Sequence, residues 1–159
     1  MRPVVNPADL ELKPFSNGEK FAVRIGEVGE ALGLKYMGCM LHVVPAGKIA
    51  FPFHRHHECD ELFLVLSGTG EYRFGEQRLP VKAGDCLSAP AGGEAHQIIN
   101  TGSDELRYLG FSNYTSADVV EYPDSGKIGV RAGVKAFDLA NKTFSTRGRV
   151  SPCDYWDGE

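Results

Sequence analysis

The chain has 159 residues, of which 42% are apolar and 24% charged, and its formal net charge is −4. These values are typical of one globular domain with its own core and exclude a disordered or fibrous chain. The negative charge argues against a nucleic-acid partner, which needs a basic face. No stretch approaches the roughly 20 apolar residues of a membrane helix, and the charged N-terminal segment lacks the apolar run of a secretory signal. We therefore expect a single cytoplasmic domain over residues 1–159, without membrane contact.

Short apolar runs separated by turn residues fill the middle of the chain. The run at 62–66 is apolar at every position, and glycine, proline or asparagine follows most of the runs. Such runs are typical of antiparallel strands, and a run that is apolar on both faces fits a strand covered on both sides. No window there offers a helical period, so the sequence predicts an all-β sandwich or barrel. The expected strands are 21–25 at an edge, 36–44, 62–66, 72–74, 79–81, 86–87, 96–99 and 106–111, with a helical turn at 28–34.

The C-terminal part of the chain carries an uneven charge. Residues 124–149 hold six basic side chains against Asp124 and Asp138. We favour the interpretation that residues 124–159 wrap the barrel and pack their basic side chains on an acidic body, over that of an anion-recruiting patch. The chain's only tryptophan, Trp156, is expected to dock on the barrel or on a partner subunit, because burial stabilises a large aromatic side chain. The basic residues are Lys127, Arg131, Lys135, Lys142, Arg147 and Arg149.

Three of the five histidines lie together at His54, His56 and His57, and Glu61 follows them. Residues two apart in a strand point to one face, so His54 and His56 can present their imidazoles side by side. Neutral imidazoles are good ligands of first-row divalent metals, and a carboxylate neutralises charge. Glu61 opens the apolar run 62–66, so a strand would hold it. The cluster therefore predicts a metal site, with His57 on the opposite face.

The histidine cluster lies within two longer motifs. The first motif reads Gly47-x6-His54-x-His56-x4-Glu61-x6-Gly68, and the second reads Gly84-x5-Pro90-x-Gly92-x3-His96-x3-Asn100. Together they resemble the two sequence motifs of the cupin superfamily, with one residue inserted before His54 and one before His96. Both insertions fall in turns, which tolerate them. Position for position, four residues match the metal ligands of that family: His54, His56, Glu61 and His96.

The resemblance covers roughly residues 36–112. It implies a cupin-type antiparallel β-barrel, also called a double-stranded β-helix or jelly roll, with extended N- and C-terminal segments. The segment 121–127 is also similar to small bacterial cupins that are labelled as sugar-phosphate isomerases. Neither motif names a reaction, and no catalytic residue follows from them.

Four protein ligands leave one or two coordination positions open on a five- or six-coordinate metal, as in a reactive site. One carboxylate on a divalent ion leaves a net positive charge, which attracts an anionic oxygen ligand. The expected cofactor is one divalent transition metal: Zn, Mn, Fe, Ni or Cu. We favour an enzyme, either an isomerase or lyase or an oxygenase, over a non-catalytic binding or storage module, which the same fold could provide.

The sequence does not choose between four candidates for a general acid or base, Glu58, Asp60, His42 and Tyr108. The expected partner is a small, oxygen-rich and anionic molecule. Cupins commonly pair through exposed edge strands and long termini, so a homodimer is expected. The expected wall residues of the pocket are Met40, Phe51, Phe53 and Ile98.

Overall fold

The computed structural model of the chain describes residues 2–134 and 141–159; Met1 and residues 135–140, which include Lys135 and Asp138 of the basic stretch, lie outside the described residues. The expected all-β class is confirmed, because the described residues form antiparallel strands with one short helix, α1, and two 3-10 turns, η1 and η2. No described helix is long and apolar enough to cross a membrane. The elements are η1 (Pro7–Asp9), β1 (Lys13–Asn17), β2 (Phe21–Gly26), α1 (Val28–Leu32), β3 (Met37–Val44), β4 (Arg55–His56), β5 (Glu61–Ser67), β6 (Thr69–Phe74), β7 (Gln77–Lys82), β8 (Cys86–Ala89), β9 (His96–Ile99), β10 (Leu106–Asn113), β11 (Ala117–Tyr122), η2 (Pro123–Ser125), β12 (Lys127–Ala132) and β13 (Phe144–Gly148).

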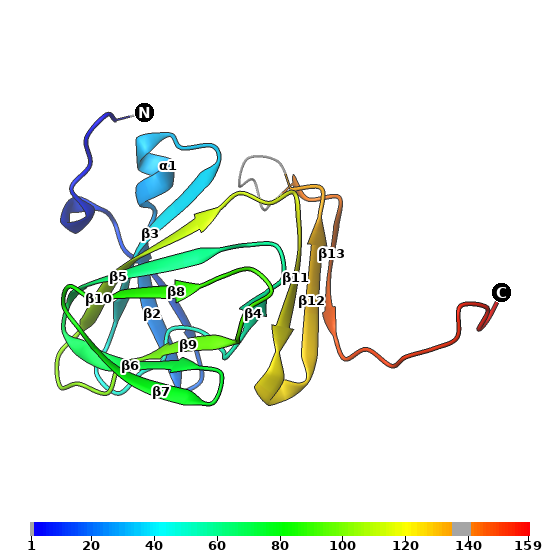
Figure 1. Cartoon of the computed structure of the whole chain (residues 1–159). Coiled ribbons are helices and arrows are strands. Elements are labelled where there is room, and N and C mark those ends of the chain that lie inside the picture. The colour runs from blue at the N-terminus through cyan, green and yellow to red at the C-terminus, as the bar shows by residue number, and fades with distance from the viewer. Residues whose placement is uncertain (1, 135–140) are drawn as a thin grey trace.

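The described strands form three antiparallel sheets. The first has the order β1-β2-β3-β10-β5-β8, the second β13-β12-β11-β4 and the third β7-β6-β9. In Figure 1 the third sheet lies below β5, β8 and β10, and β11 to β13 stand beside them. The predicted edge strand, β2, is covered by β1, which the sequence did not predict because all its residues are exposed and show no apolar alternation.

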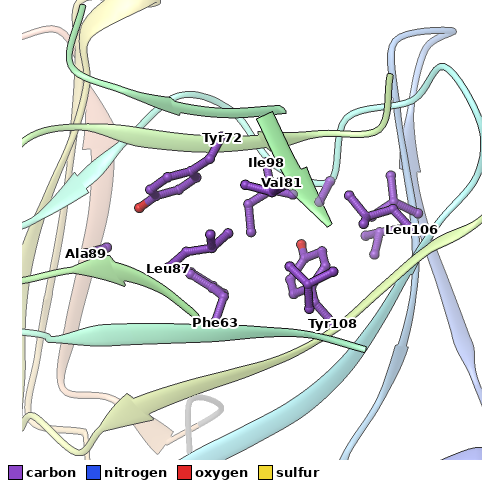
Figure 2. Packing of buried hydrophobic residues seen from close by; sticks show 12 residues of the cluster. Phe63, Tyr72, Val81, Leu87, Ala89, Ile98, Leu106 and Tyr108 are labelled. Atoms are coloured by element: carbon purple, nitrogen blue, oxygen red, sulfur yellow. The ribbon is translucent and has the colours of Figure 1, made fainter. Parts of the chain in front are cut away.

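The core fills the space between the first and the third sheet. Figure 2 shows Tyr72, Val81 and Ile98 from the third sheet together with Phe63 and Tyr108 from the first. Each of these side chains is buried, and burial of a large apolar side chain stabilises a fold by roughly 1.5–3 kcal/mol. The two sheets are therefore fixed relative to each other, and so are the side chains at their edges.

The C-terminal strands add to the sheet of β4 instead of wrapping the molecule. β11 pairs with β4 and β12, and β13 pairs with β12. The contacts of residues 124–149 with the rest of the chain are of both kinds: the acidic Asp124 binds Arg73 through two hydrogen bonds of 2.8 and 3.0 Å, and the basic Arg131 binds Asp118 at 3.3 Å. Beyond β13 the tail leads away from the sheets (Figure 1), and Trp156 is 72% exposed, so it does not dock on its own barrel.

The motif residues in turns hold the strand ends in place. Gly92 has a φ of +66°, which favours glycine, and its N–H donates to the carbonyl of His56 at 2.8 Å. Gly68 also has a positive φ, and a Cβ there would lie 2.5 Å from the carbonyl oxygen of Glu105. The buried amide of Asn100 bonds three backbone groups. The turns of both motifs thus position the strands that carry the histidines.

Candidate metal centre

Backbone pairing places His54 opposite His96. The two residues form an antiparallel bridge, in which each backbone N–H donates to the carbonyl of the other, at 3.2 and 2.7 Å. Directly opposite residues project their side chains on one face, and the two ring centroids are 4.6 Å apart. Glu61 opens β5 and pairs with both neighbouring strands, β8 and β10. All three side chains are therefore held by paired backbone.

A buried carboxylate orients His56. Its Nδ1 lies 2.5 Å from Oδ2 of Asp118, a residue that is only 1% exposed. The backbone N–H of Glu58 donates to the other oxygen of Asp118, and Arg131 Nη2 donates to Oδ2 at 3.3 Å. Because an ionised carboxylate only accepts, Nδ1 of His56 carries the proton and Nε2 keeps a free lone pair. A histidine held in this way by a second residue is typical of metal sites.

The imidazoles converge on one oxygen of Glu61. Its Oε2 lies 3.1 Å from Nε2 of His96, 3.5 Å from Nε2 of His56 and 4.0 Å from Nε2 of His54. The Nδ1 of His54 donates to the carbonyl of Pro52 at 2.7 Å, which leaves its Nε2 free as well. Three of these residues offer ligand atoms that all lie within 4.8 Å of one another: His54, Glu61 and His96.

Two atoms at the centre of this cluster are buried without a partner in hydrogen-bond geometry, although they lie 3.1 Å from each other. They are Oε2 of Glu61 and Nε2 of His96. Buried polar atoms are nearly always paired in folded proteins, and an uncompensated pair of this kind is costly. A divalent metal ion would satisfy both, and imidazole nitrogen with carboxylate oxygen is a donor set that first-row transition metals accept. The residues therefore fit a metal ion.

The electrostatics of the cluster keep the ligand atoms in their metal-binding forms. Burial alone would raise the pKa of Glu61, but the facing imidazoles of His96, His56 and His54 lower it to about 2. Burial lowers the pKa of His54 to about 4, and the neighbouring His96 acts in the same direction. Glu61 is thus ionised and His54 neutral near pH 7, as metal ligation requires.

A cavity of about 230 Å³ extends from the cluster into the space between the sheets. His54, Glu61 and His96 line one part of it, and His42 lines another. The imidazole of His42 stacks on Tyr108 with a centroid separation of 4.7 Å, and its buried Nδ1 has no hydrogen-bond partner. Burial lowers the pKa of His42 to about 4, although Glu61 opposes the shift. A neutral imidazole therefore faces the cavity.

The structure separates the four sequence candidates for an acid or base. His42 and Tyr108 line the cavity, whereas Glu58 and Asp60 are exposed and do not. His57 also lies outside the cluster, with Nε2 hydrogen-bonded to Glu121 at 2.8 Å. Of the expected wall residues, Phe53 lies beneath the guanidinium of Arg73 instead. The other three do line the cavity: Met40, Phe51 and Ile98.

Asp118 is the residue of this site that sequence reasoning missed. It lies in β11, beyond both motifs, and pairs with His56 across 62 positions of the chain. The only sequence signal is a single acid directly before Val119 and Val120. A lone carboxylate at the start of an apolar strand has no motif, so its role depends on the pairing of β11 with β4.

The sequence matches the model of one protein family. Residues 40–111 match the family model of the cupin domain. An oxalate-binding protein of Thermotoga maritima is 36% identical over 56 residues, which cover 35% of this chain and 46% of that protein. The chain thus matches less than half the length of this curated relative.

Solved structures match over most of the chain. A candidate sugar phosphate isomerase from Acidithiobacillus ferrooxidans is 26% identical, with a TM-score of 0.74 and coverage of 83% of this chain and 89% of the other. A sugar phosphate isomerase of the cupin superfamily from Silicibacter pomeroyi has a TM-score of 0.79 and covers 96% of this chain and 98% of its own. At 21% identity, this second likeness concerns the fold alone.

We expect Glu61→Gln to remove most of the bound metal, because the substitution takes away the one negative charge among the facing ligand atoms. Metal content per chain, measured by mass spectrometry after purification without an affinity metal, checks this. The control is His57→Ala, which should keep most of the metal because His57 bonds Glu121 instead. Equal metal content in the wild type and the Glu61 variant would contradict the assignment.

Asp118→Asn should lower metal affinity by roughly 10–100-fold, as loss of a residue that orients a ligand typically does. The neutral amide cannot match the charge-assisted hydrogen bond to His56, so the imidazole is held less firmly. Competition against a chelator with a metal-sensitive dye measures the effect. Glu121→Gln is the matched control, because Glu121 lies in the same strand but bonds His57 and Arg55. A similar loss in both variants would mean that the strand, rather than this contact, matters.

Proposed function

This chain contains a cupin domain over residues 40–111, and from that premise we propose that it is a metal-dependent enzyme acting on a small, oxygen-rich, anionic molecule. His54, His56, Glu61 and His96 would hold one divalent transition metal, whether Zn, Mn, Fe, Ni or Cu. The observation that carries the proposal is the pair of buried atoms without a partner in hydrogen-bond geometry, Oε2 of Glu61 and Nε2 of His96, on residues that line a cavity.

The charge of the site supports an anionic oxygen ligand. Glu61 is the sole carboxylate among the four proposed ligands, so a divalent ion there keeps a net positive charge in a cavity with largely apolar walls. A low dielectric strengthens the attraction of an anion. When bound, the metal would supply Lewis acidity for isomerase or lyase chemistry, or redox chemistry for an oxygenase. The likeness to the candidate sugar phosphate isomerase, at 26% identity, favours isomerase chemistry over oxygenase chemistry.

His42 is the proposed acid or base. It lines the same cavity as the ligands, its Nδ1 lacks a partner, and its low pKa of about 4 keeps the ring neutral. Gly110 makes room for the ring, because a Cβ there would lie 2.8 Å from its Cε1. The stacked Tyr108 fixes the ring plane. A neutral imidazole in the wall of the cavity can accept a proton or donate a hydrogen bond.

The alternative is a non-catalytic module that binds or stores a small anion. The similarity to an oxalate-binding protein supports it, because binding needs the metal and the cavity but no acid or base. The two functions differ in the role of His42. In the enzyme that residue takes part in turnover, whereas in the binding module it only lines the wall.

We also propose a cytoplasmic homodimer. Four cysteines are free, as in a reducing compartment. The outer strands β1 and β13 lie at sheet edges, and exposed edges invite pairing with another chain. Large apolar side chains accompany them: Phe15 and Phe144 on the strands, and Tyr155 and Trp156 on the tail, are all more than half exposed. A second copy of the chain could cover these residues.

His42→Gln should lower turnover by roughly 10²–10⁴-fold, the usual contribution of an acid or base, while metal content and ligand affinity stay close to the wild type. Oxalate and ribose 5-phosphate are suitable probes, with consumption followed by NMR and binding by calorimetry on the metal-loaded protein. Undiminished turnover in the variant would contradict the role of His42. Tight binding without consumption of either probe by the wild type would instead support the binding module.

Sedimentation equilibrium at tens of micromolar should give about twice the chain mass of 17.3 kDa. Tryptophan emission should be blue-shifted from the fully hydrated limit, since Trp156 would be covered only in the dimer. Dilution should shift mass and emission together. A mass near that of one chain at this concentration would overturn the proposed dimer.

A further inference from the structure

A second hollow lies on the other side of the histidines. It is a groove of about 300 Å³ between the loop at Phe51 and the sheet of β4, β11, β12 and β13. His54 lines both this groove and the internal cavity, and His56 lines the groove. Anything bound in the groove therefore lies directly beside the proposed metal centre.

The groove is basic. Arg131 and Arg147 line it together with Lys142, and no carboxylate of the described residues does so. The hydroxyl side chains of Ser145 and Thr146 also line it. Cationic groups beside hydroxyl donors are the usual composition of a site for a phosphate or another oxyanion.

Arg147 is the basic side chain of the groove whose charge is available to a ligand. Arg147 forms no ion pair with a described residue, and its guanidinium lies 5.5 Å from the ring centroid of Tyr122. Arg131 binds Asp118 through Nη2, and its Nε is buried. Arg147 thus keeps its donors available to a ligand, whereas Arg131 adds positive charge to the wall of the groove.

We propose that this groove, defined by Arg131, Arg147 and Lys142 beside His54 and His56, binds the phosphate group of a small phosphorylated ligand. The three cations belong to the basic stretch of the C-terminal sequence, which the structure brings beside the proposed metal centre. A hollow of this size, in a chain of net charge −4, fits one small anion and not a nucleic acid or a membrane surface.

That this phosphate belongs to the substrate rests on the proposed function. The metal would then bind oxygen atoms of the unphosphorylated part, and the groove would hold the charged end. Binding energy from a group remote from the reaction can position the reacting part. The substrate class that follows is a phosphorylated polyhydroxy compound, since such a molecule carries both kinds of oxygen.

The experiment compares ribose 5-phosphate with ribose, by calorimetry, on the full chain with and without metal. Arg147→Glu should weaken binding of ribose 5-phosphate at least tenfold in both forms and leave the weak binding of ribose unchanged. Arg147 lies on the exposed strand β13, so the substitution leaves the core intact. Arg149→Glu is the matched control, with the same change of charge two residues further along and outside the groove; it should change the affinity less than twofold.

Metal content of the same samples separates this proposal from the proposed function. If the chain holds no metal and its binding of ribose 5-phosphate still depends on Arg147, the phosphate site in the groove is supported and the metal-dependent enzyme is contradicted. If the wild type and the Arg147→Glu variant bind metal normally and have equal affinity for ribose 5-phosphate, the phosphate site in the groove is contradicted. The proposed metal site is then unaffected. Equal weakening by Arg147→Glu and Arg149→Glu would also contradict the phosphate site, because only general charge would then matter.

Discussion

The ionised carboxylate of Glu61, with one oxygen buried and facing three imidazoles, is the constraint on which the site depends. A buried charge is costly unless it is paired. Burial holds the pKa of His54 low, so its imidazole does not become the missing cation at neutral pH. A divalent metal ion removes the conflict, because it supplies the charge and bonds the free lone pairs at once.

The arrangement of the sheets places the cluster of histidines and Glu61 between a cavity and a groove, and His54 lines both. The packed core between the first and third sheets leaves the internal cavity, which His42 lines. The sheet of β4 and β11 to β13 supplies Asp118, which orients His56, and also the basic groove. The family match ends at residue 111, so the matched domain contains the four proposed ligands, whereas Asp118 and the cations of the groove lie in the strands beyond it.

These surroundings also bear on the choice between catalysis and binding. A module that only stores an anion has no need of a neutral imidazole in the cavity wall whose buried Nδ1 lacks a hydrogen-bond partner. His42 is held there by the stacked Tyr108 and by the absence of a side chain at Gly110. Keeping such a polar group buried without a partner destabilises the fold, and a catalytic role offers a reason for its presence.

The sequence by itself determined the strand pattern and the class of fold and predicted the donor set, because these depend on local spacing. An alternating or apolar run bounded by turn residues predicts a strand, and two histidines two apart predict a shared face. Only the tertiary structure decided which distant side chains meet them. Asp118, His42 and the groove arginines come close to the cluster of histidines and Glu61 through strand pairing and sheet packing between residues far apart in the chain. Such long-range contacts leave no fixed spacing in a single sequence, and so the basic stretch was read as a wrap although its strands build the groove.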